Sequence, residues 1–398
     1  MATLTEPKPL AARQAASAGR VSVMTIFGTR PEAVKMAPVV QRLRASAEFA
    51  PVVVTTGQHR EMLDQVTRLF GITPDVDLDI MRPEQSLVDI STRALTGLHR
   101  VLDELRPEMV LVQGDAHTTF IGALAAYYHR IPVGHIEAGL RTYDRYQPFP
   151  EEMNRRMTSA LAELQFAPTP RAKRNLLAEG IPEQSIFVTG NTVIDALQTV
   201  QDLPDVPAVP GIPPLTGRRL LLATTHRREN WGEPLREIYL ALRELLDRFP
   251  DVLLIFSVHP TPAVRRIVHD VLHDHPRAHL IEPPEYPAWV RLMQQATLIL
   301  TDSGGIQEEA TALGRPALVL RWVTERPEGV EAGTMWLVGT DRTAIVREAA
   351  RLLTDPAAYQ AMARAHNPFG DGRASERIVQ ALRFYFTRSA DRPEEFAG

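Results

Sequence analysis

The sequence predicts an α/β protein of two doubly wound, Rossmann-like domains, and three observations lead to this prediction. The chain has 398 residues, which is too long for one ordinary hydrophobic core. Short apolar runs alternate with helical stretches, as they do where a parallel sheet is covered by helices on both faces. A proline-rich run at residues 203–214 interrupts this alternation once, and the alternation starts again after it.

The first domain begins with an expected strand at residues 21–27. Gly28 to Glu32 turn this strand into a helix that reaches about residue 46, and Pro31 fits a first helical position, where its missing N–H costs nothing. Further strands are expected at residues 52–56, 110–113, 133–136, 165–167 and 186–188. Helices are expected between them, at residues 60–70, 85–105, 118–129, 152–161, 171–179 and 191–200.

The second domain repeats the pattern. Its strands are expected at residues 220–224, 252–258, 279–281, 298–301 and 317–320, and helices at 306–313, 342–353 and 373–386. The expected divisions are a disordered leader (1–20), an N-terminal domain (21–200), a linker (201–217), a C-terminal domain (218–372) and a last helix (373–388) that packs back on the N-terminal domain. Doubly wound sheets bind ligands at the carboxyl ends of their strands, so we expect the active site in the cleft between the domains.

Composition excludes several classes of protein. A net charge of −4 and a pI near 6.3 give no reason to expect nucleic acid or an anionic membrane as a partner. The absence of cysteine excludes disulfides, thiolate catalysis and cysteine-based metal sites. No apolar run approaches the roughly 18 residues that cross a bilayer. The first 20 residues lack the apolar core of a signal peptide, and an organellar transit segment is the alternative to a disordered leader. We expect a cytoplasmic protein.

Three carboxylates stand at strand ends or helix starts of the first domain. Asp115 and Glu137 each follow an expected strand, and Glu151 enters a helix. For Glu151 the alternative is an acid that favours the positive end of the helix. Three carboxylates that converge on one cleft would raise one another's pKa and suit proton transfer.

Residues 301–309 combine a strand end, a Ser-Gly-Gly turn and a helix start, which together form a potential phosphate site around Ser303. Gly304 and Gly305 would let a ligand approach the backbone, because neither has a Cβ. One turn into the helix, Glu308 or Glu309 can accept hydrogen bonds from sugar hydroxyls. The alternative is an ordinary turn between a strand and a helix.

Cationic side chains follow the first strand of each domain. Arg30 and Lys35 can meet a diphosphate, or are solvated on a surface helix. His226, followed by two arginines, suits a phosphate-bearing leaving group, and a structural histidine is the alternative. The histidines at positions 269, 273, 275 and 279 lack an evident carboxylate or cysteine partner, so we predict no metal site. Glycine motifs of dinucleotide-binding dehydrogenases and P-loop enzymes are absent, as is the serine elbow of hydrolases.

Nine segments, in the same order, resemble the non-hydrolysing UDP-N-acetylglucosamine 2-epimerase family over nearly all of residues 21–386. The segments are GTRPEAVKMAP (28–38), TGQHREMLDQV (56–66), GHIEAGLRT (134–142), PEEMNRRMT (150–158), TGNTVIDAL (189–197), HRREN (226–230), LTDSGGIQEEA (300–310), ERPEGVEAGT (325–334) and NPFGDGRASERI (367–378).

The resemblance implies a glycosyltransferase-B-like pair of domains, of which the C-terminal one binds UDP. It also implies a homodimer. It implies an isomerase of polysaccharide biosynthesis that interconverts UDP-GlcNAc and UDP-ManNAc without a cofactor or metal. UDP is eliminated to leave 2-acetamidoglucal and is then added back with protonation on the other face of C2. Two alternatives stay open: a UDP-sugar glycosyltransferase on the same fold, and a nucleotide-sugar-binding protein without chemistry.

The resemblance also assigns roles by position. The proton-transfer and charge-stabilising acids would be Asp115, Glu137 and Glu151, and His226 would assist departure of UDP. Substrate-binding residues would be Arg30 and Lys35 near the diphosphate, Ser303, Gly304 and Gly305 on phosphate, Glu309 on the ribose, Arg326 on the sugar or phosphate, and Trp289 beside the uracil.

Some positions depart from the family pattern. Pro284 replaces a Gln that contacts uracil, and Trp322 and Val323 replace an Asp-Thr pair in a loop that bears on substrate preference. A second, allosteric UDP-GlcNAc site would include Gln58 and His259. Glu84 stands where some members have Arg, which leaves allosteric activation open.

Overall fold

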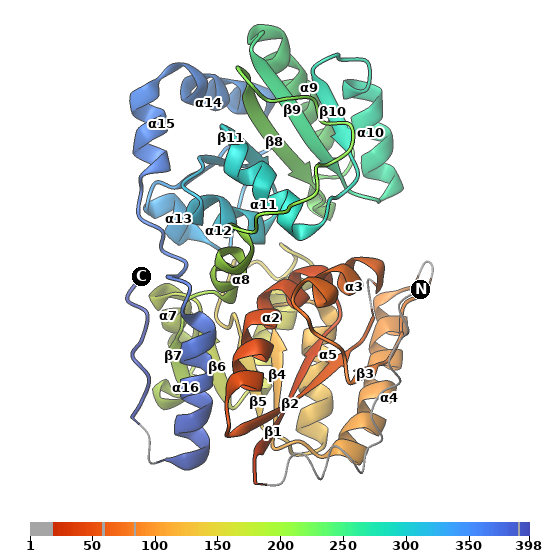
Figure 1. The fold of residues 1–398 in the computed structure, drawn as a ribbon, viewed down its shortest axis with the longest axis vertical. Helices are drawn as coiled ribbons and strands as arrows, with labels where there is room; N and C mark the ends of the chain where they lie inside the picture. Colours follow the sequence, from red (N-terminus) through yellow and green to blue (C-terminus); the bar gives the residue numbers. More distant parts are fainter. Residues whose placement is uncertain (1–18, 58–59, 83–84, 389–390) are drawn as a thin grey trace. The chain divides into compact units, whose positions relative to one another are not determined.

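The computed structural model describes residues 19–57, 60–82, 85–388 and 391–398, and the statements below concern these residues. It divides the chain into two compact units, one made of Met1–Ala196 with Gly370–Gly398 and the other of Leu197–Phe369. Each unit is a parallel α/β domain, which confirms the predicted fold class (Figure 1). The expected leader lies outside the described residues except for positions 19 and 20.

Unit 1 contains a seven-stranded sheet whose neighbours all pair in parallel, in the order β3-β2-β1-β4-β5-β6-β7. Its strands are β1 (Val21–Phe27), β2 (Phe49–Thr55), β3 (Val76–Asp77), β4 (Met109–Gln113), β5 (Val133–Ile136), β6 (Leu164–Ala167) and β7 (Ile186–Val188). From β1 the chain adds β2 and β3 toward one edge of the sheet, and from β4 onward it adds strands toward the other edge. Ligands of such sheets bind at the carboxyl ends of the strands beside the point between β1 and β4 where this order reverses.

Helices connect these strands. They are α2 (Arg30–Ala45), α3 (Arg60–Leu69), α4 (Leu87–Leu105), α5 (His117–Tyr128), α6 (Glu151–Leu161), α7 (Pro170–Ala178) and α8 (Thr192–Val200), with a 3-10 turn η1 (Glu183–Ser185). The boundary between the units falls inside α8. Strands β4 to β7 are buried at every residue, because helices cover both faces of the sheet.

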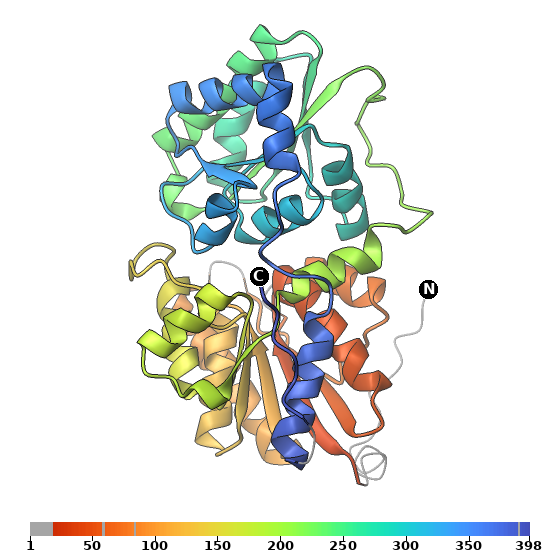
Figure 2. The ribbon, with the colours of Figure 1, turned by 90° about the vertical axis from the view of Figure 1, so that its left-hand side faces the viewer.

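The end of the chain belongs to unit 1. Helix α16 (Ala374–Thr387) packs beside α2, and the two lie together in both views (Figures 1 and 2). Its Arg383 Nε donates to both carboxylate oxygens of Glu48, at 2.9 and 2.8 Å. At its other end, the buried carboxylate of Asp195 accepts from the amides of Ala374 and Ser375, at 3.2 and 2.8 Å, and thus satisfies two N–H groups of the helix start.

Unit 2 repeats the architecture with six parallel strands in the order β10-β9-β8-β11-β12-β13, which is the Rossmann order 3-2-1-4-5-6. Its strands are β8 (Arg219–Thr225), β9 (Val252–Val258), β10 (Ala278–Ile281), β11 (Leu298–Thr301), β12 (Ala317–Val319) and β13 (Met335–Leu337). Its helical elements are η2 (Arg228–Asn230), α9 (Glu233–Arg248), α10 (Pro262–Leu272), α11 (Tyr286–Gln295), α12 (Gly304–Ala312), α13 (Pro327–Glu331), α14 (Arg342–Thr354) and α15 (Pro356–Ala363).

Residues 201–217 form neither helix nor strand, in keeping with their proline content. The segment starts against α11, where Gln294 Nε2 donates to the carbonyl of Gln201 at 3.0 Å and Arg291 Nη2 to that of Leu203 at 2.9 Å. Within the described part of the chain, none of the helices is long and apolar enough to span a bilayer.

Candidate functional site

Glu137 lies one residue past β5, at the carboxyl edge of the unit 1 sheet. It is buried, and its φ of +67° is uncommon for a residue with a side chain. Lys35 Nζ from α2 forms an ion pair with Oε2 of Glu137, and Asn191 Nδ2, before α8, donates to the same oxygen at 2.8 Å. Backbone strain of this kind is found where the surrounding structure holds a functional side chain in place.

Asp115 lies on the neighbouring strand end, two residues past β4. Strands β4 and β5 pair so that Gln113 stands opposite Ile136, which brings Asp115 and Glu137 to the same edge. Arg155, a fully buried residue of α6, forms an ion pair with Oδ2 of Asp115. Each of these two carboxylates is thus paired with a buried cation from a helix.

Glu151 is the first residue of α6 and is half-buried. The helix start is held at the end of β4, because Asn154 Nδ2 donates to the carbonyl of Asp115 at 2.9 Å. Its neighbour Glu152 has a different role: its carboxylate accepts from the amides of Thr142 and Tyr143, at 3.0 and 3.1 Å, and so fixes the preceding loop.

The turn after β1 is organised by Glu32, which the sequence analysis did not single out. Its buried carboxylate accepts from the amides of Gly28 and Thr29, at 3.1 and 2.7 Å, and from the hydroxyl of Thr119 at 2.9 Å. Burial raises the pKa of Glu32, and these hydrogen bonds oppose the rise. The signal was present in the sequence, since Thr29 and Glu32 have the spacing of a capping box. Arg30, the first residue of α2, is half-buried beside this turn.

In unit 2, the Ser-Gly-Gly turn follows β11 and begins α12. Ser303 occupies the N-cap position, so the first amides of the helix have no partner within the helix. A Cβ on Gly304 would stand 2.3 Å from Nη1 of Arg326, whereas a Cβ on Gly305 would meet nothing within 4 Å. The turn is therefore closely packed at Gly304 and open at Gly305.

Arg326 lies beneath this turn in a buried network of charges. Its Nε donates to Glu308 at 2.6 Å and its Nη1 to Glu325 at 2.5 Å, while Arg321 Nη1 reaches the other oxygen of Glu325 at 2.8 Å. All four side chains are buried. Arg326 thus places a positive charge against the backbone of Gly304, and the acid at position 308 is engaged with it.

Glu309, the other acid left open by the sequence, is held by α11. The hydroxyl of Tyr286 donates to Oε1 of Glu309 at 2.7 Å, and both residues are buried. Trp289, one turn further along α11, is also buried. These three residues belong to the two helices on either side of β11 in the chain.

His226 lies one residue past β8, at the edge that also holds Asp302. Its Nδ1 is 3.1 Å from Oδ1 of Asp302, and its ring stacks on that of His259, with centroids 5.8 Å apart. Strands β8 and β11 are neighbours, so His226 and the Ser303 turn come to the same edge of the unit 2 sheet. The structure thus groups the predicted residues into two sets, one at the strand ends of each unit.

The other positions named in the sequence analysis concern the allosteric site, the Trp322 loop and a metal site. Gln58 and Glu84 lie outside the described residues. Trp322 is 68% exposed, yet its ring covers Gly339, where a Cβ would come within 2.6 Å. The rings of His269, on α10, and His273, just after its end, lie 5.4 Å apart, and among the described side chains no group of three potential ligands is arranged around a metal position.

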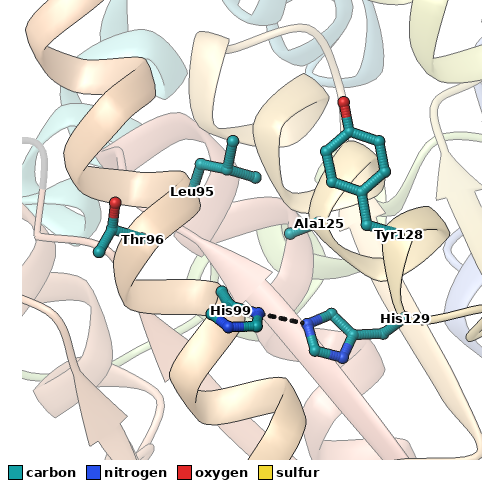
Figure 3. Close-up of a pocket in the computed structure, with 6 residues that line it drawn as sticks. All are labelled: Leu95, Thr96, His99, Ala125, Tyr128 and His129. Atoms are coloured by element: carbon teal, nitrogen blue, oxygen red, sulfur yellow. Dashed lines mark hydrogen bonds between the residues drawn. The ribbon is translucent and has the colours of Figure 1, made fainter.

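A separate pocket lies between α4 and α5, away from the strand ends (Figure 3). His99 and His129 face each other across it, with Nδ1 of the first 2.9 Å from Nε2 of the second. Its lining is completed by Leu95, Thr96, Ala125 and Tyr128. No predicted site residue takes part in it.

Comparison with known proteins gives consistent matches. The family model described as UDP-N-acetylglucosamine 2-epimerase matches residues 41–383. The chain is 50% identical to a UDP-N-acetylglucosamine 2-epimerase of Bacillus subtilis over 379 residues, covering 95% of this chain and 99% of that one. It is 51% identical to the Escherichia coli K12 protein of the same name over 370 residues, covering 91% and 98%.

Solved structures match the chain over nearly the same length as these sequence relatives do. A UDP-GlcNAc 2-epimerase from Neisseria meningitidis bound to UDP-GlcNAc matches with a TM-score of 0.86 at 47% identity, covering 91% of this chain and all of that chain. The S. aureus MnaA–UDP co-structure matches with a TM-score of 0.90 at 45% identity, covering 95% and 100%. The glycosyltransferase SnogD from Streptomyces nogalater, at 17% identity and a TM-score of 0.57, covering 91% and 99%, shares the fold alone.

Proposed function

The chain belongs to the UDP-N-acetylglucosamine 2-epimerase family, and we propose that it interconverts UDP-GlcNAc and UDP-ManNAc by elimination and re-addition of UDP. The observation that carries the proposal is the pair of carboxylates Asp115 and Glu137, which share one sheet edge in unit 1. Inversion at C2 requires a group that removes the proton from one face and a group that returns one to the other, and two adjacent carboxylates meet this need.

The proposed reaction conserves atoms and charge without a redox step. The bond between C1 and the β-phosphate oxygen breaks, one carboxylate takes the C2 proton, and the products held in the site are UDP and 2-acetamidoglucal. In the second half, the phosphate oxygen attacks C1 and a carboxyl group donates a proton to the opposite face of C2. Positive charge builds on the ring as C1–O cleavage leads, and the carboxylates, Glu151 among them, stabilise it.

The nucleotide is assigned to unit 2. The unengaged amides at the start of α12, with Ser303 and Gly305, suit a diphosphate, and the Arg326 charge beneath Gly304 adds to their attraction. Glu309 would accept from the ribose and Trp289 would contact the uracil. His226 would stand at the departing oxygen. The proposal requires both sets of residues to act on one substrate molecule, with Arg30 and Lys35 of unit 1 on the diphosphate side.

The paired state of Lys35 refines its proposed role. Its ammonium forms an ion pair with Glu137, so it would hold that carboxylate toward the sugar as well as attract phosphate. The homodimer, the second UDP-GlcNAc site at Gln58 and His259, the cytoplasmic location and the role in polysaccharide biosynthesis remain predictions. Dependence of the UDP-ManNAc reaction on added UDP-GlcNAc would test the second site.

Incubation with UDP-GlcNAc in D2O, followed by NMR of the recovered sugars, tests the proposal. We expect UDP-ManNAc to form with deuterium at C2, and the recovered UDP-GlcNAc to acquire deuterium there as well through the reverse reaction. Glu137→Gln should abolish both, while Asp103→Asn, a change of an exposed acid on α4, should leave both unchanged. Turnover without deuterium at C2 would exclude this route, and reaction only with an added acceptor would indicate a glycosyltransferase.

A further inference from the structure

Asp302, which has no role in the proposed reaction so far, is a fully buried carboxylate immediately after β11. Its Oδ1 accepts from the amide of His226 at 3.0 Å and its Oδ2 from that of Arg227 at 3.0 Å, while Asn230 Nδ2 donates to Oδ2 at 3.2 Å. Nδ1 of His226 lies 3.1 Å from Oδ1. One carboxylate thus fixes both the backbone and the ring of His226.

The contact with Asp302 decides where His226 carries its protons. An ionised carboxylate only accepts hydrogen bonds, so Nδ1 must be protonated to bind it. Burial opposes ionisation of Asp302, but the nearby His226 charge and the donated hydrogen bonds outweigh it, and the pKa of Asp302 is lowered. With Nδ1 engaged, Nε2 is left on the other side of a ring that is 34% exposed.

The ring of His259, which stacks on that of His226, is held through its Nδ1. The amide of Thr261 donates to this nitrogen at 3.3 Å, and the hydroxyl oxygen of Thr261 lies 2.9 Å from it. The guanidinium of Arg227, the neighbouring cation, has partners of its own: its Nε donates to the carbonyl of Asp302 at 3.3 Å and its Nη2 lies 3.8 Å from Glu325.

We propose that Asp302 is a positioning residue that holds the Nδ1 proton of His226 and thereby directs Nε2 to the phosphate oxygen that leaves C1. This inference rests on the proposed function. In the forward step the doubly protonated ring gives its Nε2 proton to the departing oxygen as the C1–O bond breaks. The ring is then neutral, and its remaining Nδ1–H still donates a hydrogen bond to Asp302. Re-addition of UDP returns the proton to Nε2.

A double-mutant cycle on the full-length protein tests this role. Asp302→Asn should lower kcat by about 10- to 100-fold, the usual effect of removing a carboxylate that orients a functional histidine. In His226→Gln, whose amide can still donate to phosphate, the added Asp302→Asn change should lower kcat by less than about twofold. If the two effects multiply, Asp302 does not act through His226 and the proposal is overturned.

A second measurement needs neither a folded Asp302 variant nor turnover. In protein labelled with 15N-histidine, the ring signals missing from His226→Gln identify His226 among the 12 histidines. We expect the ring of His226, in its neutral form, to carry its proton on Nδ1. A proton on Nε2 would overturn the positioning role. If the tautomer is as expected and wild-type protein forms no UDP-ManNAc, the proposed function has failed and the Asp302 contact stands.

Discussion

Replacing either glycine of the Ser-Gly-Gly turn by alanine should separate packing from ligand binding. In Gly304→Ala the new Cβ would lie 2.3 Å from Nη1 and 2.8 Å from Cζ of Arg326. That guanidinium cannot move aside without leaving Glu308 and Glu325, at 2.6 and 2.5 Å. Overpacking of this kind costs about 1–3 kcal/mol, and loss of the buried ion pairs would cost about 3–5 kcal/mol. The better helix propensity of alanine offsets at most about 1 kcal/mol. We therefore expect the free energy of unfolding to fall by about 2 kcal/mol.

Gly305→Ala is the matched control for stability. Nothing lies within 4 Å of its Cβ position and its backbone is not left-handed, so the free energy of unfolding should be unchanged or rise by up to about 1 kcal/mol. The same methyl group would enter the space proposed for phosphate, and UDP should bind about tenfold more weakly, a loss of about 1.4 kcal/mol.

Tryptophan fluorescence during urea unfolding is a suitable assay. All four tryptophans, at positions 231, 289, 322 and 336, belong to unit 2, so the signal follows the unit that carries the substitution. UDP affinity is measured by calorimetry on the same samples. Equal unfolding midpoints for Gly304→Ala and wild type would refute the packing argument, and unchanged UDP affinity in Gly305→Ala would refute the phosphate assignment.

Two further predictions concern unit 1. Burial lowers the pKa of His135 from 6.5 to about 4, although its Nε2 donates a hydrogen bond to the carbonyl of Gly114, so below pH 6.5 the unfolded chain takes up a proton that the folded protein does not. The free energy of unfolding should therefore fall by about 2 kcal/mol between pH 6.5 and 5. His135→Gln should remove that part of the pH dependence, measured by unfolding followed by circular dichroism, and an unchanged pH dependence would contradict the prediction. Asp195→Ala removes three hydrogen bonds to the start of α16, including one of 2.6 Å from the hydroxyl of Ser375, and should lower the free energy of unfolding by about 2 kcal/mol. Amide hydrogen exchange in α16 should accelerate, while the unfolding of unit 2 followed by tryptophan fluorescence should not change. Wild-type exchange rates in α16 would show that other contacts hold the helix.

Much of the fold followed from apolar periodicity. The ranges of helices α9, α10, α11, α13 and α15 and of two short edge strands were not predicted. Strands β1, β5, β7, β9 and β11 begin and end as predicted, because each is a short, mainly apolar stretch between helical or turn segments. Two strands were not predicted. Strand β3 has only two residues and β13 only three, so both are shorter than the runs of about four or more residues that indicate a strand.

In the candidate site, residues that follow a strand could be predicted from the sequence, whereas their partners from distant parts of the chain could not. Asp115, Glu137 and His226 were predicted because each follows a strand whose end a parallel sheet brings to the ligand-binding edge. Their partners were not. Asn191 is 54 residues from Glu137, and Asp302 is 76 residues from His226. Such pairs depend on how side chains from different elements meet in space, which the spacing of residues along one sequence does not encode.

The return of the chain to its first unit has a consequence for biosynthesis. Unit 2 is one continuous stretch, whereas unit 1 is assembled from the first 196 residues and the last 29, residues 370–398. Domains fold as units while the chain is being made, so unit 2 can complete its core on the ribosome. The face of α2 that α16 covers, and the ring of Phe49 that meets Phe386, wait until residues 374–387 have been made, after the whole of unit 2. The unit whose synthesis starts first is therefore completed after the other, and a ribosome that stalls after unit 2 would leave an apolar surface for chaperones to recognise.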